Sequence, residues 1–412
     1  MSPPRTGSAV TSRRRFGIEA VDERGTATTL ELLFDLAFVF ALTEITALMA
    51  ADLSATGILR AVLVLTVVWW CWVDYSWLAN LVKADEGTTR TAMLLAMAAI
   101  FVVALAIPES FDDLPGGLSG PATFAVGYLV VRAIHIVQFA LAGRGGEGPR
   151  RQLVLFTLTA VGSTALLLLA AATEGATQTL LWGAVVLIDY GGTLAIGHRG
   201  WRVSSARHFA ERHGLIVIVA LGESVVAIGV GVGHLPISWP IVCAAVLGVS
   251  ITISLWWVYF DTAALRAEHA LTREVGRRRV AMAQAAYTYL HLPMLAGIVL
   301  LALGLKKVLE HVAGQGGHQL GDALHGIGLW ALYGGVALYL LSHAAFSLRT
   351  YRSPDLAAVA TALLLLVLPL AAGHLPAIVS LALVAALLVA LNLFQSLRHR
   401  DLRRRIRHEH TA

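Results

Sequence analysis

The chain has 412 residues, of which 57% are hydrophobic and only 14% are charged, and its formal net charge is +5 at pH 7. Soluble domains are close to half apolar and a quarter charged, so this composition excludes an ordinary water-soluble protein. The two cysteines, Cys71 and Cys243, both lie in apolar stretches, which excludes a disulfide framework and a cysteine-based metal site.

Apolar stretches long enough to cross a membrane as helices recur along the whole chain. A helix needs about 20 apolar residues to cross the hydrocarbon core. We therefore predict an all-α, polytopic transmembrane helix bundle with about twelve spans. The predicted spans are 30–49, 58–80, 91–107, 121–141, 152–172, 178–197, 214–233, 239–260, 282–305, 323–347, 356–373 and 374–396.

The basic residues are distributed unequally between the two sides of this predicted bundle. Of the 31 Lys and Arg residues, 27 lie in segments that share a side with the N-terminus. Cytoplasmic loops of membrane proteins carry such an excess of Lys and Arg. We therefore predict a multi-pass protein of the cell membrane with both termini in the cytoplasm. Its expected partner is the lipid bilayer, and the positive charge reflects topology rather than nucleic-acid binding.

The second half of the chain resembles the first in short motifs that occur in the same order. "LAFVFALTE" (36–44) matches "LIVIVALGE" (215–223), and "WWCWVD" (69–74) matches "WWVYFD" (256–261). "YLVVR" (128–132) matches "YLLSH" (339–343). Because six spans per half is an even number, we predict a parallel repeat of two six-helix halves. The alternative is chance similarity between apolar helices, which share a small set of residue types.

This repeat divides the chain into five predicted segments. They are a cytoplasmic N-terminal tail (1–29), a first six-helix half (30–197), a cytoplasmic connector (198–213), a second six-helix half (214–396) and a basic cytoplasmic tail (397–412).

Ionisable residues inside the predicted spans are candidates for a functional site. Glu31 and Asp35 are four residues apart and share one face of a helix. Arg132 lies near the middle of its span with His135 on the same face, and Glu223 is the deepest acid. A buried Arg needs a carboxylate partner or a wet cavity, and we expect the partner to be Asp35 or Glu223.

These five residues are the predicted pathway for a proton or a substrate, because intramembrane ionisable groups generally mark such pathways. The alternative is an ion pair that only locks the helices together. Four further acids, Glu44, Asp74, Asp189 and Asp261, are secondary candidates. Asp74 and Asp261 each follow an aromatic stretch, so we expect them in the aromatic belt at the inner membrane surface. For Asp189, a helix-to-helix hydrogen bond and a functional role are equally compatible with the sequence.

The segment "RHFAERHG" (207–214) contains three potential metal ligands, His208, Glu211 and His213. Their spacing matches neither HExxH nor HxxEH, so we predict no metal site here and no cofactor. The sequence contains no phosphate-binding loop, no dinucleotide glycine pattern and no nucleophile elbow with its partners. We therefore predict that the protein is not an enzyme.

Three motifs, "TLELLFDLAFVFALTE", "WWCWVDYSWLANL" and "HFAERHGLIVIVALGES", together resemble the bacterial low temperature requirement A family of multi-pass membrane proteins. The resemblance points to a set of residues shared with the family: Glu31, Phe34, Asp35, Trp69, Trp70, Trp77, Asn80, His208, Glu211, Arg212, Gly222 and Glu223. The family more usually has glutamine where this chain has Glu44, which favours Glu223 as the proton carrier. The family name records growth at low temperature and implies no reaction.

We predict a secondary transporter of a small solute, coupled to protons. The alternative is a non-transporting membrane protein that supports membrane adaptation or assembly in the cold. A third alternative, an intramembrane enzyme that acts on lipid, lacks a recognisable nucleophile.

Overall fold

The computed structural model describes residues 25–142, 147–198, 200–233 and 236–398, and over these ranges the chain is built from helices without a β-strand element. The helices are α1 (Thr29–Ala51), α2 (Ala55–Ala79), α3 (Gly87–Leu105), α4 (Gly120–Ala142), α5 (Glu147–Ala171), α6 (Gly175–Ile196), α7 (Ala206–Val232), α8 (Trp239–Phe260), α9 (Ala263–Arg273), α10 (Gly276–Met282), the π-helix η1 (Ala283–Tyr289), α11 (Leu290–Val312), the short 3₁₀-helix η2 (Gln315–Gly317), α12 (Gly326–Tyr351), α13 (Leu356–Val367), α14 (Pro369–Ala372) and α15 (Ala377–Arg398).

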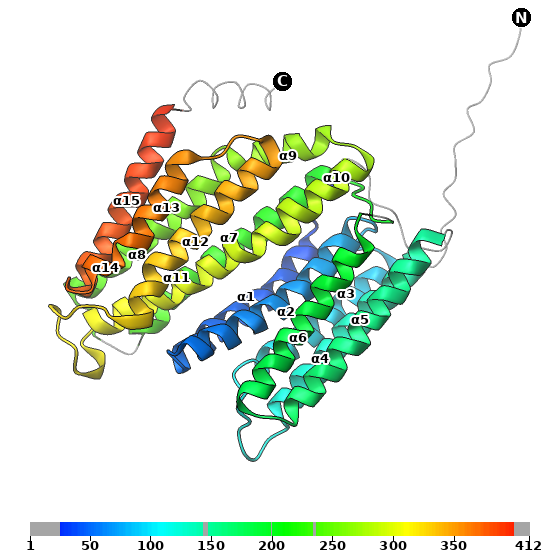
Figure 1. The fold of residues 1–412 in the computed structure, drawn as a ribbon, viewed down its shortest axis with the longest axis horizontal. Helices are drawn as coiled ribbons and strands as arrows, with labels where there is room; N and C mark the ends of the chain where they lie inside the picture. The colour runs from blue at the N-terminus through cyan, green and yellow to red at the C-terminus, as the bar shows by residue number, and fades with distance from the viewer. Residues whose placement is uncertain (1–24, 143–146, 199, 234–235, 399–412) are drawn as a thin grey trace, which may run out of the picture.

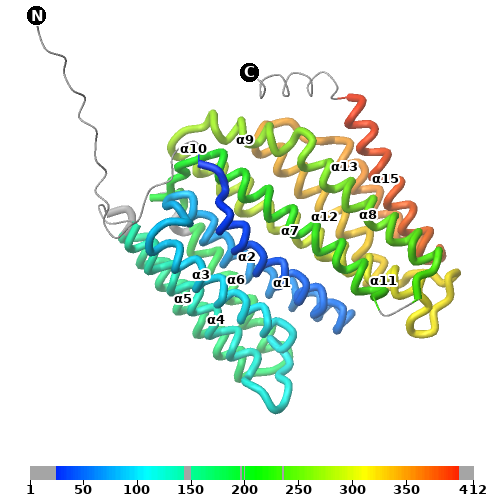
Figure 2. The backbone as a smooth tube through the Cα atoms, turned by 180° about the vertical axis from the view of Figure 1, so that it is seen from behind, coloured from blue at the N-terminus to red at the C-terminus, as the bar shows by residue number. Residues whose placement is uncertain are grey.

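The helices form two groups that follow the order of the chain. Helices α1 to α6 lie together on one side, and α7 to α15 lie together on the other (Figure 1). We call these groups the first and second halves. They meet where α1 and α2 pack against α7 and α11, and Figure 2 shows α1 running along this boundary. The boundary between the halves is therefore formed by helices far apart in sequence.

The polytopic all-α architecture is confirmed. Among the described residues, ten helices are long and apolar enough to cross a membrane. The remaining two predicted spans correspond to α6 and to the shorter, broken pair α13–α14, which together cover Leu356–Ala372. The two-repeat relationship stays a prediction.

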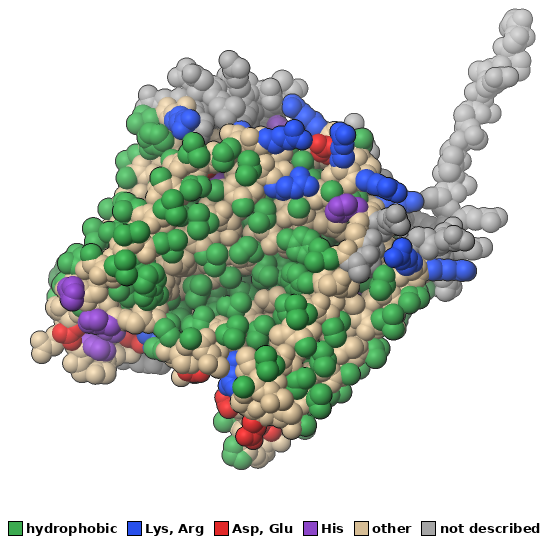
Figure 3. All heavy atoms as spheres, in the orientation of Figure 1, with side chains coloured by type: hydrophobic (Ala, Val, Ile, Leu, Met, Phe, Trp, Pro, Cys, Tyr) green, Lys and Arg blue, Asp and Glu red, His purple; other side chains and the backbone are tan. Residues whose placement is uncertain are grey.

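The outer surface of the bundle is apolar, as expected for a surface that contacts lipid. On α6, Leu180, Leu187 and Leu194 are spaced by seven residues and are 74%, 74% and 66% exposed. This spacing places them on one face of the helix. Figure 3 shows hydrophobic side chains over the flanks of both halves, whereas Lys and Arg gather at the end that holds α9 and α10. We call this end the basic end.

Helix α7 begins earlier than the sequence pattern predicts. The predicted span starts at residue 214, but the helix starts at Ala206, where the Ser205 hydroxyl caps it by accepting from the His208 backbone N–H at 3.1 Å. His208, Glu211 and Arg212 therefore lie within the helix rather than in the connector. Hydropathy alone missed this stretch because His208, Arg212 and His213 are polar and yet buried.

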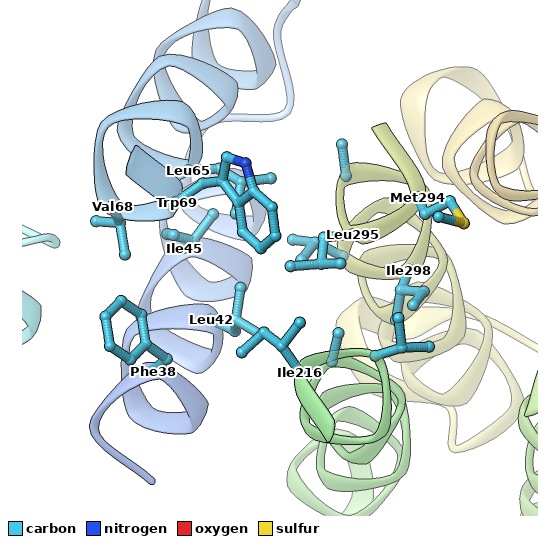
Figure 4. Close-up of a cluster of buried hydrophobic side chains, with 14 of the residues drawn as sticks. Phe38, Leu42, Ile45, Leu65, Val68, Trp69, Ile216, Met294, Leu295 and Ile298 are labelled. Atoms are coloured by element: carbon cyan, nitrogen blue, oxygen red, sulfur yellow. The ribbon is translucent and has the colours of Figure 1, made fainter. Parts of the chain in front are cut away.

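The centre of the boundary between the halves is filled by apolar side chains. Figure 4 shows a cluster to which α1, α2, α7 and α11 all contribute. Its labelled members are Phe38, Leu42, Ile45, Leu65, Val68, Trp69, Ile216, Met294, Leu295 and Ile298. Polar groups on the boundary lie on either side of this apolar layer along α1 and α7.

Candidate functional site

A cluster of buried charges joins the start of α1 to the start of α7. Glu31 closes a capping box with Thr28 at the N-terminus of α1 and also accepts from His208 Nε2 at 3.0 Å. Asn80 Nδ2 lies 3.2 Å from His208 Nδ1. Because an amide nitrogen only donates, His208 Nδ1 accepts and Nε2 carries the proton that is donated to Glu31. Glu31 is thus both a helix cap and a link between the halves.

One turn deeper, Asp35 forms a second pair across the same boundary. Arg212 donates to the Asp35 carboxylate at 3.0 Å and to the Glu31 carbonyl oxygen at 2.9 Å. The indole N–H of Trp72 donates to the other Asp35 oxygen at 2.9 Å. Glu31, Asp35 and Arg212 are almost completely buried. We call Glu31, Asp35, Trp72, Asn80, His208 and Arg212 the interface cluster.

Asn80, at the C-terminus of α2, anchors the segment that connects the two halves. Its side-chain nitrogen donates to the Ser205 carbonyl at 2.7 Å, and its side-chain oxygen accepts from the Ser204 N–H at 2.7 Å. Asn80 therefore fixes both the end of the connecting segment and the tautomer of His208.

The π-helix η1 ties the second half to α2. A π-helix shifts the backbone hydrogen bonds by one residue, which leaves carbonyl groups available for other donors. The indole N–H of Trp69 donates to the Thr288 carbonyl at 3.0 Å, and that of Trp77 donates to the Thr288 hydroxyl at 3.0 Å. Two residues of the aromatic motif thus bind one threonine across the boundary.

A cavity of about 300 Å³ reaches the interface cluster from the basic end. Glu31 and His208 line its inner part together with Thr28 and Ala79. Lys83, Asp85 and Glu86 also line it. A polar solute or a proton in this cavity therefore meets the bonded pair Glu31–His208 before it reaches Asp35.

Beyond the apolar layer, a further acid lies on the same boundary. Glu223 of α7 is 1% exposed and accepts from the Thr43 hydroxyl of α1 at 2.5 Å. Glu44, the next residue on α1, is half-buried. The boundary thus carries ionisable groups on both sides of its apolar centre.

Arg132 does not join this boundary, and the prediction that Asp35 or Glu223 is its partner is wrong. The guanidinium of Arg132 forms an ion pair with Asp74, donates to the Thr159 hydroxyl at 3.0 Å and lies 3.9 Å from Asp189. His135 Nδ1 lies 3.7 Å from Asp74. All of these groups belong to α2, α4, α5 and α6, so the pairing is internal to the first half. We call Asp74, Arg132, His135 and Asp189 the first-half cluster.

The prediction that Asp74 lies in an interfacial aromatic belt is also wrong, because its side chain is only 3% exposed. The tryptophans that precede Asp74 pack inside the protein rather than at the lipid boundary. Asp189 links helices as a hydrogen-bond acceptor, since it accepts from the hydroxyl groups of Tyr128 and Ser163, each at 2.9 Å. Asp261, at the end of α8, is half-buried.

The remaining motif residues lie at several places along α1, α2 and α7. Phe34 is fully buried and its ring centroid lies 5.0 Å from that of Tyr75. Trp70 contacts Tyr190 at 4.6 Å between centroids, and Glu211 accepts from the Ala27 backbone N–H at 3.1 Å. A Cβ added at Gly222 would meet no atom of the described residues within 4 Å.

Sequence reasoning missed Trp72, Thr43 and Thr159 as partners of the charged groups, and Thr288 as the partner of two motif tryptophans. Trp72 had a usable signal, because it lies within the aromatic motif one turn or less from Asp74 and Trp69. The three threonines carry no sequence signal, since threonine is common in membrane helices.

The comparisons with known proteins agree with these motifs. The family described as bacterial low temperature requirement A protein (LtrA) matches residues 26–393. The chain is 30% identical over 295 residues to the uncharacterized protein RA0937 of Rhizobium meliloti (strain 1021), covering 68% of this chain and 69% of that protein. No solved structure matches the chain.

Proposed function

We propose that this chain, which belongs to the bacterial low temperature requirement A family, is a secondary transporter of a small solute whose path runs between its two halves. It is an integral, multi-pass membrane protein. The observation that carries the proposal is the interface cluster: buried charges on both sides of the boundary, reached by a cavity. Intramembrane ionisable groups that face a cavity are typical of substrate or proton paths.

The arrangement along the boundary suits alternating access. The cavity ends at Glu31 and His208, and the apolar cluster closes the boundary beyond them. In the opposite state, α1 and α2 would move relative to α7 and α11, opening the side that holds Glu223. The order of neighbours supports a repeat: α1 packs on α2 and α3 as α7 packs on α8 and α11, and α3 packs on α4 as α11 packs on α12.

We further propose that Glu31 couples transport to protons. Ionised Glu31 holds the N–H of His208 across the boundary at 3.0 Å. Protonation of Glu31 removes the charge from this bond and weakens the link between α1 and α7. A proton that binds the two states unequally shifts their equilibrium.

Thermal unfolding of the purified full chain against a panel of ions and small metabolites tests the binding step. A ligand at a hundred times its dissociation constant stabilises the folded state by about 2.7 kcal/mol. We expect a ligand that stabilises wild type and loses its effect in Glu31→Gln. Glu44→Gln is the matched control, because Glu44 is on the same helix but half-buried and outside the cavity. An equal effect in wild type and both variants would contradict the proposal.

Transport in proteoliposomes tests the coupling step with the ligand so identified. We expect Glu31→Gln and Glu223→Gln to abolish the dependence of uptake on a pH gradient while the protein still folds. Normal pH-dependent uptake by both variants would rule out proton coupling through these acids.

The same proposal places both termini in the cytoplasm and the protein in the cell membrane. The support is the position of the Lys and Arg residues, which gather at the basic end.

The second candidate function is a non-transporting protein that supports membrane adaptation or assembly in the cold. Its specific support is Asp35, whose two carboxylate oxygens accept from Trp72 and Arg212. Such an arrangement suits a structural link between the halves. Under this alternative, the double variant Asp35→Asn/Arg212→Gln restores growth at low temperature that each single variant loses.

A further inference from the structure

The acids of the interface cluster have no free position for a positively charged solute. The carboxylates of Glu31 and Asp35 are almost completely buried, and each of their oxygens already accepts a hydrogen bond. The donors are Thr28, His208, Trp72 and Arg212. A cation would have to displace one of these donors from a buried carboxylate.

Arg212, in contrast, has hydrogen-bond donors without acceptors. Its Nη1 atom donates to Asp35 and to the Glu31 carbonyl oxygen. Its Nε and Nη2 atoms are buried and donate to no group in the described part of the chain. These two N–H groups point in parallel from one edge of the planar guanidinium, which matches the two oxygens of a carboxylate. We call this edge the Arg212 fork. Since buried donors are almost always bonded, the fork requires an acceptor.

The Arg212 fork lies next to the cavity. Its Nε atom is 3.7 Å from Oε1 of Glu31, which is too far for a hydrogen bond, and Glu31 lines the cavity. Glu31 is therefore close to both the cavity and the fork. Arg132 differs, because both of its terminal nitrogens have partners, Asp74 and Thr159. An open edge is thus a property of Arg212 and not of both buried arginines.

The surrounding charges determine when an anion can occupy the fork. The charged and titratable groups that face Glu31 are Asp35 on α1, His208 and Arg212 on α7, and Lys83, Asp85 and Glu86 across the cavity. Lys83 pairs with Glu86, so acids prevail and an anion alone would be repelled. A proton that enters with a monovalent anion leaves the net charge of the cluster unchanged. Glu31 can take this proton, because the Nδ1 atom of His208 already accepts from Asn80.

We propose that the solute is a small monocarboxylate that enters together with one proton, an inference that rests on the transport function proposed above. The solute carboxylate accepts from the Nε and Nη2 N–H groups of Arg212. The proton binds the Glu31 carboxylate, and the new O–H of Glu31 donates to the solute. Loss of the Glu31 charge weakens the bond from His208, so binding of the solute and release of the link between α1 and α7 occur at the same residue. A divalent anion would add a net buried charge, which is costly.

Thermal unfolding of the purified full chain at a mildly acidic and a neutral pH tests the class of solute. The probes are acetate, propionate and lactate, each compared with its neutral amide, together with propylammonium and inorganic phosphate, all at equal ionic strength. We expect the carboxylates to raise the unfolding temperature of wild type more than their amides do, with the larger rise at acidic pH. An equal rise with carboxylates and amides, or a larger rise with propylammonium or phosphate, overturns the assignment.

Matched variants test whether the carboxylate binds at the fork. Arg212→Lys keeps the positive charge beside Asp35 but removes the paired N–H groups. Loss of one hydrogen bond to a charged group weakens the apparent affinity about tenfold or more. Arg207→Lys, exposed on the same helix and outside the cavity, should respond as wild type does. An unchanged response in Arg212→Lys contradicts binding at the fork. If Arg212→Lys fails to fold, Glu31→Gln decides: it cannot take up the proton, so a wild-type pH dependence in this variant overturns the proposal.

Uptake in proteoliposomes separates the class of solute from the proposed function itself. We expect carboxylate uptake that a proton gradient drives and that a membrane potential does not change, because anion and proton enter as a neutral pair. Uptake of a cation or of a neutral solute instead would support transport but overturn the carboxylate assignment. Carboxylate binding without uptake would contradict transport and still support the fork as a carboxylate site.

Discussion

At the scale of single residues, the chain contains two buried charge clusters that differ in their surroundings. The first-half cluster places Arg132 between two aspartates of the same half, so its ion pairs do not cross the boundary. The interface cluster places Arg212 next to Glu31 and Asp35 at the base of a cavity. Similar chemistry therefore suits a structural role in the first cluster and a binding role in the second.

Arg132→Gln should be strongly destabilising, because it leaves Asp74 and Asp189 buried without a basic partner. Breaking a buried ion pair by removing one partner costs about 3–5 kcal/mol. Denaturant-induced unfolding in detergent measures the loss. Arg90→Gln, at an exposed position on α3, is the control and should change stability by about 0.5 kcal/mol or less. Similar losses of stability in the two variants would show that the ion pair of Arg132 does not contribute to stability.

Trp72→Phe should also destabilise the protein, because it keeps a large ring but removes the N–H that donates to Asp35. A hydrogen bond to a charged group contributes about 1.5–3 kcal/mol. Trp70→Phe is the matched control, since Trp70 is equally buried but contacts Tyr190 through its ring. The measurement is the free energy of unfolding of the two variants, which should fall more in Trp72→Phe. An equal loss in both would mean that the smaller ring, rather than the lost hydrogen bond, causes the destabilisation.

The sequence identified Glu31, Asp35, Arg132 and Glu223 as charged residues within the spans, and all four are buried, but it did not show which residues pair. Asp74, Arg132 and Asp189 each lie six to nine residues from the predicted inner end of their spans, so equal depth was a usable signal for this pairing. Asp35 and Arg212 gave no such signal, because Arg212 fell outside the predicted span. Lateral contacts between helices depend on packing, which hydropathy does not record.

At the scale of helices, α11 and α12 approach each other unusually closely at glycines. A Cβ added at Gly335 would lie 2.6 Å from the Gly297 carbonyl oxygen and 2.6 Å from the Leu301 nitrogen. A Cβ at Gly304 would lie 2.5 Å from the Leu332 backbone. Small residues at membrane helix interfaces permit such close contact of backbones. The pair α11–α12 is therefore held together by shape rather than by polar bonds.

Gly335→Ala should force these helices apart, since the atoms it would meet belong to the backbone and cannot rotate away. Overpacking of this kind costs about 1–3 kcal/mol. The neighbouring Gly334→Ala is an internal control: its Cβ would meet no atom of the described residues within 4 Å. Replacing a helical glycine by alanine without a clash stabilises by about 0.5–1 kcal/mol. We therefore expect Gly335→Ala to lower the unfolding temperature and Gly334→Ala to raise it. A change in the same direction in both variants would contradict the close contact of the backbones.

Helix positions were predicted well because hydrophobic length determines them, as α8 illustrates: its predicted and observed bounds are both 239–260. The errors occurred where helices extend beyond the apolar region. Helix α7 begins eight residues before its predicted span, and η1 interrupts the α10–α11 span with a π-helix that hydropathy does not distinguish from an α-helix. The start of α7 belongs to the interface cluster, and η1 contacts the aromatic motif. Hydropathy therefore predicts the helices least well at the candidate site.

At the scale of the whole molecule, a parallel repeat of the two halves would fix which loops share a side of the membrane. Gly116 follows α3, and Gly321 follows α11, and both lie in loops with no described atom near an added Cβ. Six membrane crossings separate them if α6 crosses the membrane, because α8–α9 and α10–η1–α11 each count as one crossing. An even number of crossings returns the chain to the same side, so Gly116 and Gly321 should face the same compartment.

Labelling of single cysteines with a membrane-impermeant maleimide measures this directly, in a background lacking Cys71 and Cys243. Gly116→Cys and Gly321→Cys should both be labelled in intact cells. Arg278→Cys, exposed on α10 at the basic end, should be labelled only in inverted vesicles. Labelling of Gly116→Cys and Gly321→Cys from opposite sides would mean that α6 does not cross the membrane. Of the helices between these two positions, α6 is the one that is not among the ten candidate membrane spans of the described residues. That outcome would rule out the predicted parallel repeat and, with it, the pseudo-symmetric boundary on which the proposed alternating access depends.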